Sequence, residues 1–478
     1  MTLTRVKPAS IFRFLALLLP PIAVALSAST SASTPIDPSG WPSRFPAKDH
    51  CSKCGLCETT FVSKVTEACA FLGDGMGRID VLESEVHGRR RREELVWSKN
   101  NVDPSNQEEG RFGVLERPIA LARGREKGAQ WTGVVTGIAA AALEGGLVDA
   151  VVCVADGGEE GFADPFPIIA RTVEDVMKGR GVKPSLSPSL RVLDEVRSDP
   201  SIRRLLFCGV GCAVQALRSV EEELGLDELL VLGTNCADNS PTPEAAKNFL
   251  DAGVGVEDVN TVKGYEFMQD FSVHVKMDSD YTKTPYFCLP GTVAAPSIAT
   301  SCLACFDYIN SLADVVVGYM GAPLPKGGRM DLADQTLTIR NAKGASLVDN
   351  AIARGRLDIK NPSAGGSGKH EKLASATVAK DSAVVAITGG KIPEKGMPRL
   401  AGEVMATVLG GLGPKGIAFA RYSLDYHVLR NYLHTVNEWG EKTATRRMPK
   451  YARDMIEEYT QSDEQFRVIR EAVLAKSK

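Results

Sequence analysis

The hydrophobic and polar positions divide the chain into short apolar runs and longer amphipathic stretches. Runs at 151–154, 204–206 and 229–232 have the length of buried strands. An apolar stretch at 401–412 and a charged amphipathic stretch at 449–476 have helical periodicity. This order predicts an α+β protein, with a mixed α/β core followed by a helical C-terminal region.

The composition fits a folded protein. The chain has 478 residues, of which 44% are apolar and 24% charged, and its net charge is −3. This length allows roughly two to four domains, and the apolar content excludes disorder as the dominant state. With 56 basic against 59 acidic residues, no nucleic-acid partner is expected on charge grounds. The eleven cysteines are clustered and carry most of the information.

The N-terminus has the composition of a targeting leader. Residues 1–36 contain no acid, and an apolar run at 14–26 is shorter than the roughly 20 residues that a membrane span needs. A Ser/Thr/Ala string follows at 27–34. A signal followed by a transit-like stretch predicts import into a complex plastid and removal of residues 1–47. The alternative is an ordinary secreted protein, whose cysteines would lie in an oxidising compartment.

A first cysteine set lies directly behind this leader. The thiols are two residues apart in C-x2-C-x2-C, and a fourth follows after eleven residues: Cys51, Cys54, Cys57 and Cys69. Three equal steps in a Gly-containing loop favour a [4Fe–4S] cluster over zinc or structural thiols. Ala70 stands where bacterial ferredoxins have proline, so Cys69 is the least certain ligand.

A second cysteine set is spread over strand ends and a C-x2-C pair. Because neighbouring parallel strands end at one edge of a sheet, these thiols can meet. The predicted ligands of a second [4Fe–4S] cluster are Cys212, Cys236, Cys302 and Cys305. Cys208 is the spare member of this set, and Cys153 and Cys288 are expected to be packing residues.

Two clusters require a partner that converts single electrons into pairs, and flavin does so. A Gly-bearing helix entry at 128–136 offers free N–H groups to a phosphate, although such an entry alone is weak evidence. No strand is followed by G-x-G-x-x-G, so NAD(P) is not predicted. The candidate flavin-binding residues are Gly128, Gln130, Thr132, Gly133, Thr136, Arg171, Lys183, Ser185 and Ser187.

Seven segments together resemble a known family: 51–74, 128–136, 183–190, 204–212, 265–271, 301–323 and 413–433. They are similar to the family of 7-hydroxymethyl chlorophyll a reductase and the ferredoxin-dependent 8-vinyl reductase of chlorophyll synthesis. That family is related to the β subunit of coenzyme F420-reducing hydrogenase. The resemblance covers roughly residues 48–460. It implies FAD, two [4Fe–4S] clusters, reduced ferredoxin as electron donor and a chlorophyll-type tetrapyrrole as substrate.

The resemblance divides between two activities. The stretch 310–323 looks nearer the 8-vinyl reductases, whereas Cys208 and the stretch 234–236 look nearer the 7-hydroxymethyl enzymes. Since many algae with complex plastids make no chlorophyll b, we expect reduction of the 8-vinyl group of divinyl (proto)chlorophyllide. The alternative is reduction of 7-hydroxymethyl chlorophyll a. Two further alternatives, an F420-type oxidoreductase subunit and an electron carrier, are less favoured. Ala213 and Gly264 replace a Gln and a His common in the family.

The reduction also needs a proton donor. In the block at 413–433 we favour His427, with Asp425 as a second candidate; two residues apart, they do not share a helix face. Glu266 and Asp270, in the block at 265–271, are the other option.

The expected organisation has five parts. They are a leader (1–47), a ferredoxin-like iron–sulfur module with an arm (48–112), an α/β flavin and iron–sulfur core (113–323), a flexible insert and linker (324–396) and a helical C-terminal region (397–478). The four arginines at 89–92 suit acidic ferredoxin, although a solvated face is the favoured interpretation. Residues 401–412 are expected in the core rather than as a patch for thylakoid lipid. The oligomeric state is not predicted.

Overall fold

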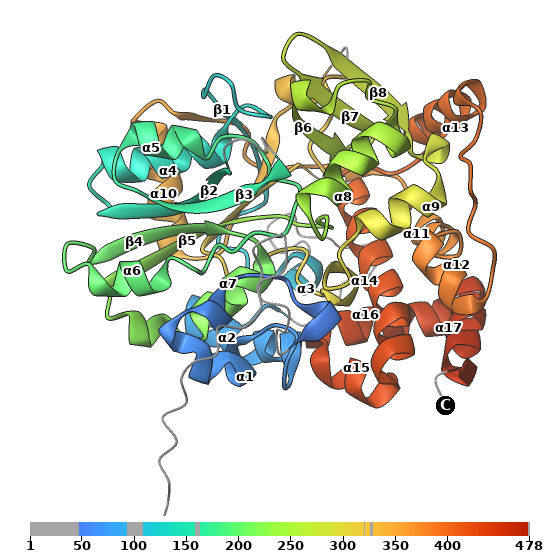
Figure 1. The fold of residues 1–478 in the computed structure, drawn as a ribbon, viewed down its shortest axis with the longest axis horizontal. Coiled ribbons are helices and arrows are strands. Elements are labelled where there is room, and N and C mark those ends of the chain that lie inside the picture. Colours follow the sequence, from blue (N-terminus) through green and yellow to red (C-terminus); the bar gives the residue numbers. More distant parts are fainter. Residues whose placement is uncertain (1–46, 93–108, 158–162, 320, 326–327, 477–478) are drawn as a thin grey trace, which may run out of the picture. The chain divides into compact units, whose positions relative to one another are not determined.

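The computed structural model describes residues 47–92, 109–157, 163–319, 321–325 and 328–476, which belong to one compact unit, Phe45–Lys478. An eight-stranded sheet forms its centre (Figure 1). In spatial order the strands are β11 (Leu357–Asn361), β1 (Ala120–Gly124), β10 (Gln335–Ile339), β9 (Val315–Gly318), β5 (Glu228–Thr234), β4 (Arg204–Gly209), β2 (Ala150–Asp156) and β3 (Pro165–Ala170).

The middle of this sheet is parallel and its edges are antiparallel. Strands β2, β4, β5 and β9 run in the same direction, whereas β3, β10, β1 and β11 pair with their neighbours in the opposite sense. Cys208 lies opposite Leu232 in the register of β4 and β5, so both strands end at the same edge. The predicted mixed α/β core is confirmed.

Helices cover both faces of the sheet. Leu206 points to the face covered by α4 (Val134–Glu144) and α10 (Ala342–Ala353), whereas Leu205 and Phe207 point to the opposite core. The α4 side is dominated by alanine, which lets the helix lie close to the strands. Other helices flanking the sheet are α5 (Val173–Lys178), α6 (Leu193–Ser198) and α7 (Gly211–Arg218).

A three-stranded antiparallel meander follows in the chain. It consists of β6 (Val262–Phe267), β7 (Ser272–Met277) and β8 (Tyr281–Pro285). Through a small core of its own it packs on the π-helical segment η7 (Phe249–Val254), which continues α8 (Pro243–Asn248), and on the end of α9 (Gly291–Ala294). Glu266 and His274 lie directly opposite each other on β6 and β7, so their side chains share one face.

The described N-terminal residues are short turns and helices. The 3-10 turns η1 (Lys48–His50), η2 (Leu56–Glu58), η3 (Thr60–Lys64) and η4 (Gly75–Arg78) alternate with α1 (Val65–Ala68) and α2 (Ile79–His87), and α3 (Glu109–Phe112) follows. Arg91 is buried and ion-paired with Glu83 at 2.8 Å, and Arg89 pairs with Glu109 at 2.7 Å. The solvated face predicted for 89–92 is therefore wrong for these two arginines. The remaining arm, 93–108, lies outside the described residues.

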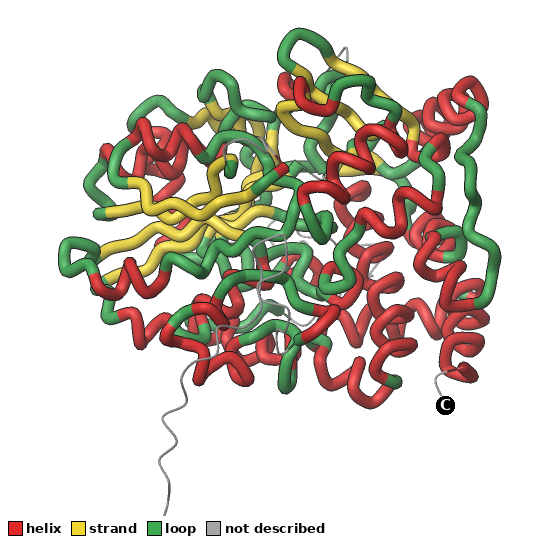
Figure 2. Tube along the Cα trace, viewed as in Figure 1, coloured by secondary structure: helices red, strands yellow, loops and turns green. Residues whose placement is uncertain are grey.

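The C-terminal region is helical, as predicted (Figure 2). A long central helix, α14 (Ile417–Trp439), packs against all the other α-helices of this region except α13 (Arg399–Leu412). The other helices are α11 (Glu371–Val378), α12 (Ser382–Thr388), α15 (Glu441–Arg447), α16 (Lys450–Ser462) and α17 (Glu464–Lys476), with a small ribbon of β12 (Gly366–Ser367) and β13 (Lys415–Gly416). Among the described residues no helix combines the length and hydropathy that a membrane crossing requires.

Two expectations change against this fold. The segment 324–396, predicted as a flexible insert, supplies the strands β10 and β11 to the main sheet and the helix α10 that covers it. The Gly/Ser run at 363–368 suggests a flexible segment. Earlier in the same segment, however, Gln335–Ile339 form β10, which pairs with β1 and β9. The stretch 449–476 is two helices rather than one, separated at Asp463. The leader lies outside the described residues up to position 46.

Candidate functional site

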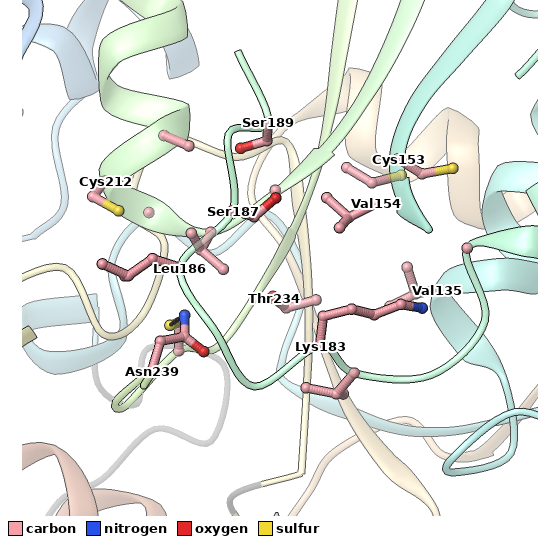
Figure 3. Close-up of a pocket in the computed structure, with 18 of the residues that line it drawn as sticks. Val135, Cys153, Val154, Lys183, Leu186, Ser187, Ser189, Cys212, Thr234 and Asn239 are labelled. Atoms are coloured by element: carbon pink, nitrogen blue, oxygen red, sulfur yellow. Dashed lines mark hydrogen bonds between the residues drawn. The ribbon is translucent and has the colours of Figure 1, made fainter. Parts of the chain in front are cut away.

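A cavity of about 240 Å³ opens at the carboxyl edge of the parallel strands (Figure 3). Its wall includes Cys153 and Val154 from β2, Cys208 from β4 and Thr234 from β5. Ligands of open α/β sheets bind at this edge. The predicted convergence of strand ends is thus present, and a loop at 181–189 closes the cavity from the side.

Two helix N-termini point at this cavity, those of α4 and α7. Gly133, the residue before α4, has φ of +82°, and a Cβ on it would lie 2.5 Å from the Cβ of Glu126. Thr132 Oγ1 accepts the N–H of Gly124 at 3.1 Å, which fixes the turn against β1. Paired helix N-termini with a close glycine turn form a site for phosphate.

The loop at 181–189 adds a cation and hydroxyl groups. Lys183 is buried, donates to the carbonyl of Arg180 at 2.7 Å and lies 3.3 Å from Asp156. Burial lowers the pKa of Lys183 despite that carboxylate. The hydroxyls of Ser185 and Ser187 are buried and have no hydrogen-bond partner among the described residues. Such orphaned hydroxyls beside a lysine fit the phosphate and ribityl oxygens of a flavin nucleotide.

Six of the nine predicted flavin-binding residues line the cavity: Gln130, Gly133, Thr136, Lys183, Ser185 and Ser187. Gly128 and Thr132 belong to the turn before α4 but are not lining residues. Arg171 is ion-paired with Asp199 at the surface. The structure therefore does not bring Arg171 together with the others.

The first cysteine set surrounds a second, smaller cavity of about 20 Å³. Cys51, Cys54, Cys57 and Cys69 all line it. Backbone N–H groups point at sulfur, from Lys53 to Cys51 at 3.2 Å and from Phe71 to Cys69 at 3.5 Å. N–H donors at thiolate sulfur are a feature of iron–sulfur sites.

The second cysteine set lines the large cavity. Cys212, Cys236, Cys302 and Cys305 are all part of its wall. Asn239 donates to two of these sulfurs, from its backbone to Cys302 at 3.4 Å and from its side chain to Cys236 at 3.6 Å. Cys54 lines both cavities, so the two sets are adjacent.

The donor chemistry of both sets fits iron–sulfur clusters. Desolvation raises the pKa of Cys51 and Cys302 to about 12 and that of Cys212 to about 11. Such thiols are neutral at physiological pH until a cationic centre binds them as thiolates. Within the part of the chain that the structure describes, no three His, Cys, Asp or Glu side chains are placed to hold a single metal ion.

A buried carboxyl group lies behind the cavity wall. Gln130 donates from Nε2 to Glu266 Oε1 at 3.0 Å, and its Oε1 accepts the N–H of Val182 at 3.1 Å. Burial raises the pKa of Glu266 to about 8, although hydrogen bonds from Tyr319, Trp131 and Gln130 favour its charged form. Glu266 therefore holds a proton at neutral pH, one residue away from the cavity.

Gly264 accounts for the position of Gln130. A Cβ on Gly264 would lie 2.0 Å from Gln130 Oε1. A histidine at this position, which the resemblance leads us to expect, would displace the Gln130 side chain. The glycine at position 264 thus leaves room for the Gln130 amide, which occupies the space that a larger side chain would need.

The other two catalytic candidates lie elsewhere. His427 donates from Nδ1 to the carbonyl of Ser423 at 2.6 Å, stacks on Tyr308 and has Nε2 3.6 Å from Asp238. Asp425 is fully buried and accepts hydrogen bonds from three residues, Arg111, His370 and Tyr459. Neither side chain lines either cavity, and their catalytic roles stay predictions.

Some lining residues were not predicted from the sequence. Ser52, Thr234, Asn239 and Gln335 contribute polar groups to the large cavity. Asn239 follows Cys236 by three residues, so a polar residue close to a strand-end cysteine was the available signal. No sequence signal marks Gln335, because it begins a strand in the segment that is predicted to be an insert.

Comparisons with known proteins agree with this arrangement. Two models of coenzyme F420 hydrogenase/dehydrogenase β subunits match, the N-terminal one at residues 120–194 and the C-terminal one at 202–364. The chain is 45% identical over 417 residues to the chloroplastic 7-hydroxymethyl chlorophyll a reductase of Oryza sativa subsp. japonica, covering 87% of this chain and 83% of that protein.

Two further relatives extend the comparison. An uncharacterized protein of Nostoc sp. is 40% identical over 419 residues, covering 87% of this chain and 95% of its own. The β subunit of coenzyme F420 hydrogenase from Methanococcus voltae is 28% identical over 266 residues, covering 52% of this chain and 86% of the subunit. The C-terminal model reaches residue 364, in agreement with the strands found beyond residue 323.

Proposed function

The chain belongs to the family of 7-hydroxymethyl chlorophyll a reductase, within the relatives of F420 hydrogenase β subunits, and we propose that it is a ferredoxin-dependent reductase of chlorophyll metabolism. The named rice relative is a chloroplast protein, and we assign this chain to the chloroplast as well. The observation that carries the proposal is one cavity whose wall holds the second cysteine set, a phosphate cradle and Gln130, the partner of Glu266.

We infer that FAD and two [4Fe–4S] clusters are the cofactors. The large cavity would take FAD, with its phosphates at the N-termini of α4 and α7 and beside Lys183. The first and second cysteine sets would each hold one cluster. When bound, these groups supply single-electron transfer and the pairing of two electrons for the substrate. Since Cys54 lines both cavities, the path between them is short.

Glu266 is the proton donor that the geometry favours over His427 and Asp425. Its Oε1 accepts from Gln130, and its carboxyl group carries a proton at neutral pH because burial disfavours the charged form. Gln130 stands between Glu266 and the cavity, so its side chain would have to move aside for Glu266 to protonate a substrate there. His427 and Asp425, by contrast, are held by other polar side chains outside the lining.

The neighbouring strand carries a buried histidine that is held between two other side chains. His274 lies opposite Glu266 on the neighbouring strand and donates from Nε2 to Asp270 at 2.9 Å. Tyr281 donates to His274 Nδ1 at 2.7 Å, which fixes the ring. Asp270 is partly exposed and therefore connects this buried histidine to solvent.

The 7-hydroxymethyl group is the first candidate substrate, because the rice relative bears that activity in its name. Two electrons and two protons convert the hydroxymethyl group to a methyl group and water, and Glu266 would protonate the leaving hydroxyl. The 8-vinyl group of divinyl (proto)chlorophyllide, expected from the stretch 310–323, is the second candidate. There, two electrons and two protons give an ethyl group, and Glu266 would protonate one vinyl carbon.

A competition assay tests the proposal. The full chain is reconstituted anaerobically with iron, sulfide and FAD and given reduced ferredoxin with equal amounts of a divinyl chlorophyllide and 7-hydroxymethyl chlorophyll a. We expect loss of the hydroxymethyl pigment; loss of the divinyl pigment alone would select the second candidate. Bound iron without flavin or turnover would indicate an electron carrier, and reduction of F420 instead would indicate an F420-type subunit.

A further inference from the structure

Helix α13 carries a row of exposed aliphatic side chains. Leu400, Val404, Val408 and Leu412 are spaced four residues apart, so they form one stripe along the helix. Their exposed fractions are 75%, 57%, 47% and 83%. We call these four residues the α13 stripe. The sequence placed this helix in the core, but only Gly402 and Ala406 are buried, and this expectation is wrong.

The outward orientation of the stripe follows from how α13 is attached. A Cβ on Gly402 would lie 2.3 Å from Cys288 Sγ, so the helix rests closely on the turn after β8 through its small residues. Met397 N–H donates to Phe287 O at 2.7 Å, and Arg399 donates to Lys283 O at 2.8 Å. These bonds fix the start of the helix beside β8 (Figure 1). With the small residues inward, the aliphatic row faces out.

Cations flank the stripe in the sequence. Lys391 and Lys395 precede the helix, Arg399 begins it and Lys415 follows it, against the two acids Glu394 and Glu403, for a net charge of +2. Both acids lie within ion-pair distance of cations of the same segment. The stripe itself holds no charge and no aromatic residue.

We propose that the α13 stripe seats the protein on an anionic lipid surface. Aliphatic side chains flanked by Lys and Arg are the pattern of helices that lie in the membrane interface, with the cations at the headgroups. Protein interfaces instead rely on aromatic and arginine anchors, which the stripe lacks. This inference stands on α13 alone and does not depend on the identity of the reduced pigment.

Vesicle flotation of the reconstituted full chain tests the inference. We expect flotation with phosphatidylcholine vesicles in which about a third of the lipid is phosphatidylglycerol, and loss of it in high salt. Val404→Ser with Val408→Ser should lower lipid partitioning at least about tenfold, because two aliphatic side chains lose their burial. Lys391→Gln should lower it about fivefold.

A matched variant separates the stripe from general hydrophobicity. Val62→Ser with Val468→Ser changes two valines that are 54% and 57% exposed elsewhere on the surface, and should leave flotation unchanged. Pigment reduction in detergent should be unaltered in both double variants. No flotation, or equal loss in both double variants, would overturn the inference. So would a dimer in light scattering that only the α13 variant dissociates, since a second copy would then cover the stripe.

Discussion

Replacing Glu266 with glutamine tests the proton donor most directly. The amide keeps the size of the side chain and an oxygen that can accept from Gln130 Nε2, now 3.0 Å away. It removes the proton that the carboxyl group holds at neutral pH. We expect the rate of pigment reduction to fall by about 10²–10⁴, the usual contribution of a general acid, with FAD and iron contents unchanged.

The pH dependence follows from the raised pKa. With a pKa of about 8, Glu266 is about 90% protonated at pH 7 and about 9% at pH 9, so the rate of the unsubstituted enzyme should fall about tenfold between them. The Glu266→Gln variant should not show this decrease in rate at alkaline pH. A rate that stays constant to pH 9, or a variant with full activity, would refute the assignment of Glu266 as donor.

The same shift has a consequence for stability, with a defined sign. The pKa of Glu266 rises on folding from 4.5 to about 8, so between these values the folded state holds a proton that the unfolded state has released. The free energy of unfolding should therefore fall by about 1.4 kcal/mol per pH unit across that window and level off above it, a total of roughly 5 kcal/mol at most. Glu266→Gln should lose this slope in melting experiments.

Glu458 provides the control. Its pKa is also raised to about 8, mainly by burial, but it lies on α16 beside Arg111 and Asp425. Glu458→Gln should flatten the stability profile in the same direction, by a smaller amount because the side chain is half-exposed, and leave the alkaline limb of activity in place. If both variants changed activity alike, the effect would come from stability rather than proton transfer.

The remaining predictions concern the cofactors and the packing. Cys57→Ser should remove the first cluster and about half of the bound iron while FAD is retained; loss of FAD as well would contradict two separate sites. Lys183→Met should weaken FAD binding about ten- to hundredfold in flavin titrations, as expected for a lost hydrogen bond to a charged group, whereas Arg171→Met should not. Asp425→Asn should destabilise the fold by about 3–5 kcal/mol, because Arg111 would stay buried without its carboxylate; a fall in kcat at unchanged stability would restore Asp425 as a catalytic candidate.

The sequence predicted those parts of the site that depend on spacing and strand ends. The convergence of Cys212 and Cys236 follows from parallel strands that end together, and the turn before α4 follows from Gly133. It failed where tertiary context decides. The partner of Asp425 is Arg111, some 300 positions earlier in the chain, and no local pattern could show that this carboxylate is saturated. Similarly, the apolar content of α13 does not show which side of the helix faces the protein, because Gly402 and Ala406 are buried whereas Leu400 and Leu412 are exposed.

The position of Cys54 explains why the N-terminal cysteine loop and the α/β core have to act as one unit. The loop could in principle serve as a separate electron carrier, since its four cysteines are close in sequence. However, Cys54 also lines the large cavity, Ser52 hydrogen-bonds to Cys212, and Leu190 donates to the carbonyl of Cys54 at 2.8 Å. A Cβ on Gly55 would lie 3.0 Å from the backbone nitrogen of Arg191, so the loop rests directly on the segment that carries Ser187. Through Cys54 the first cysteine set adjoins the cavity wall, so under the proposed function an electron held there would lie next to the site of reduction.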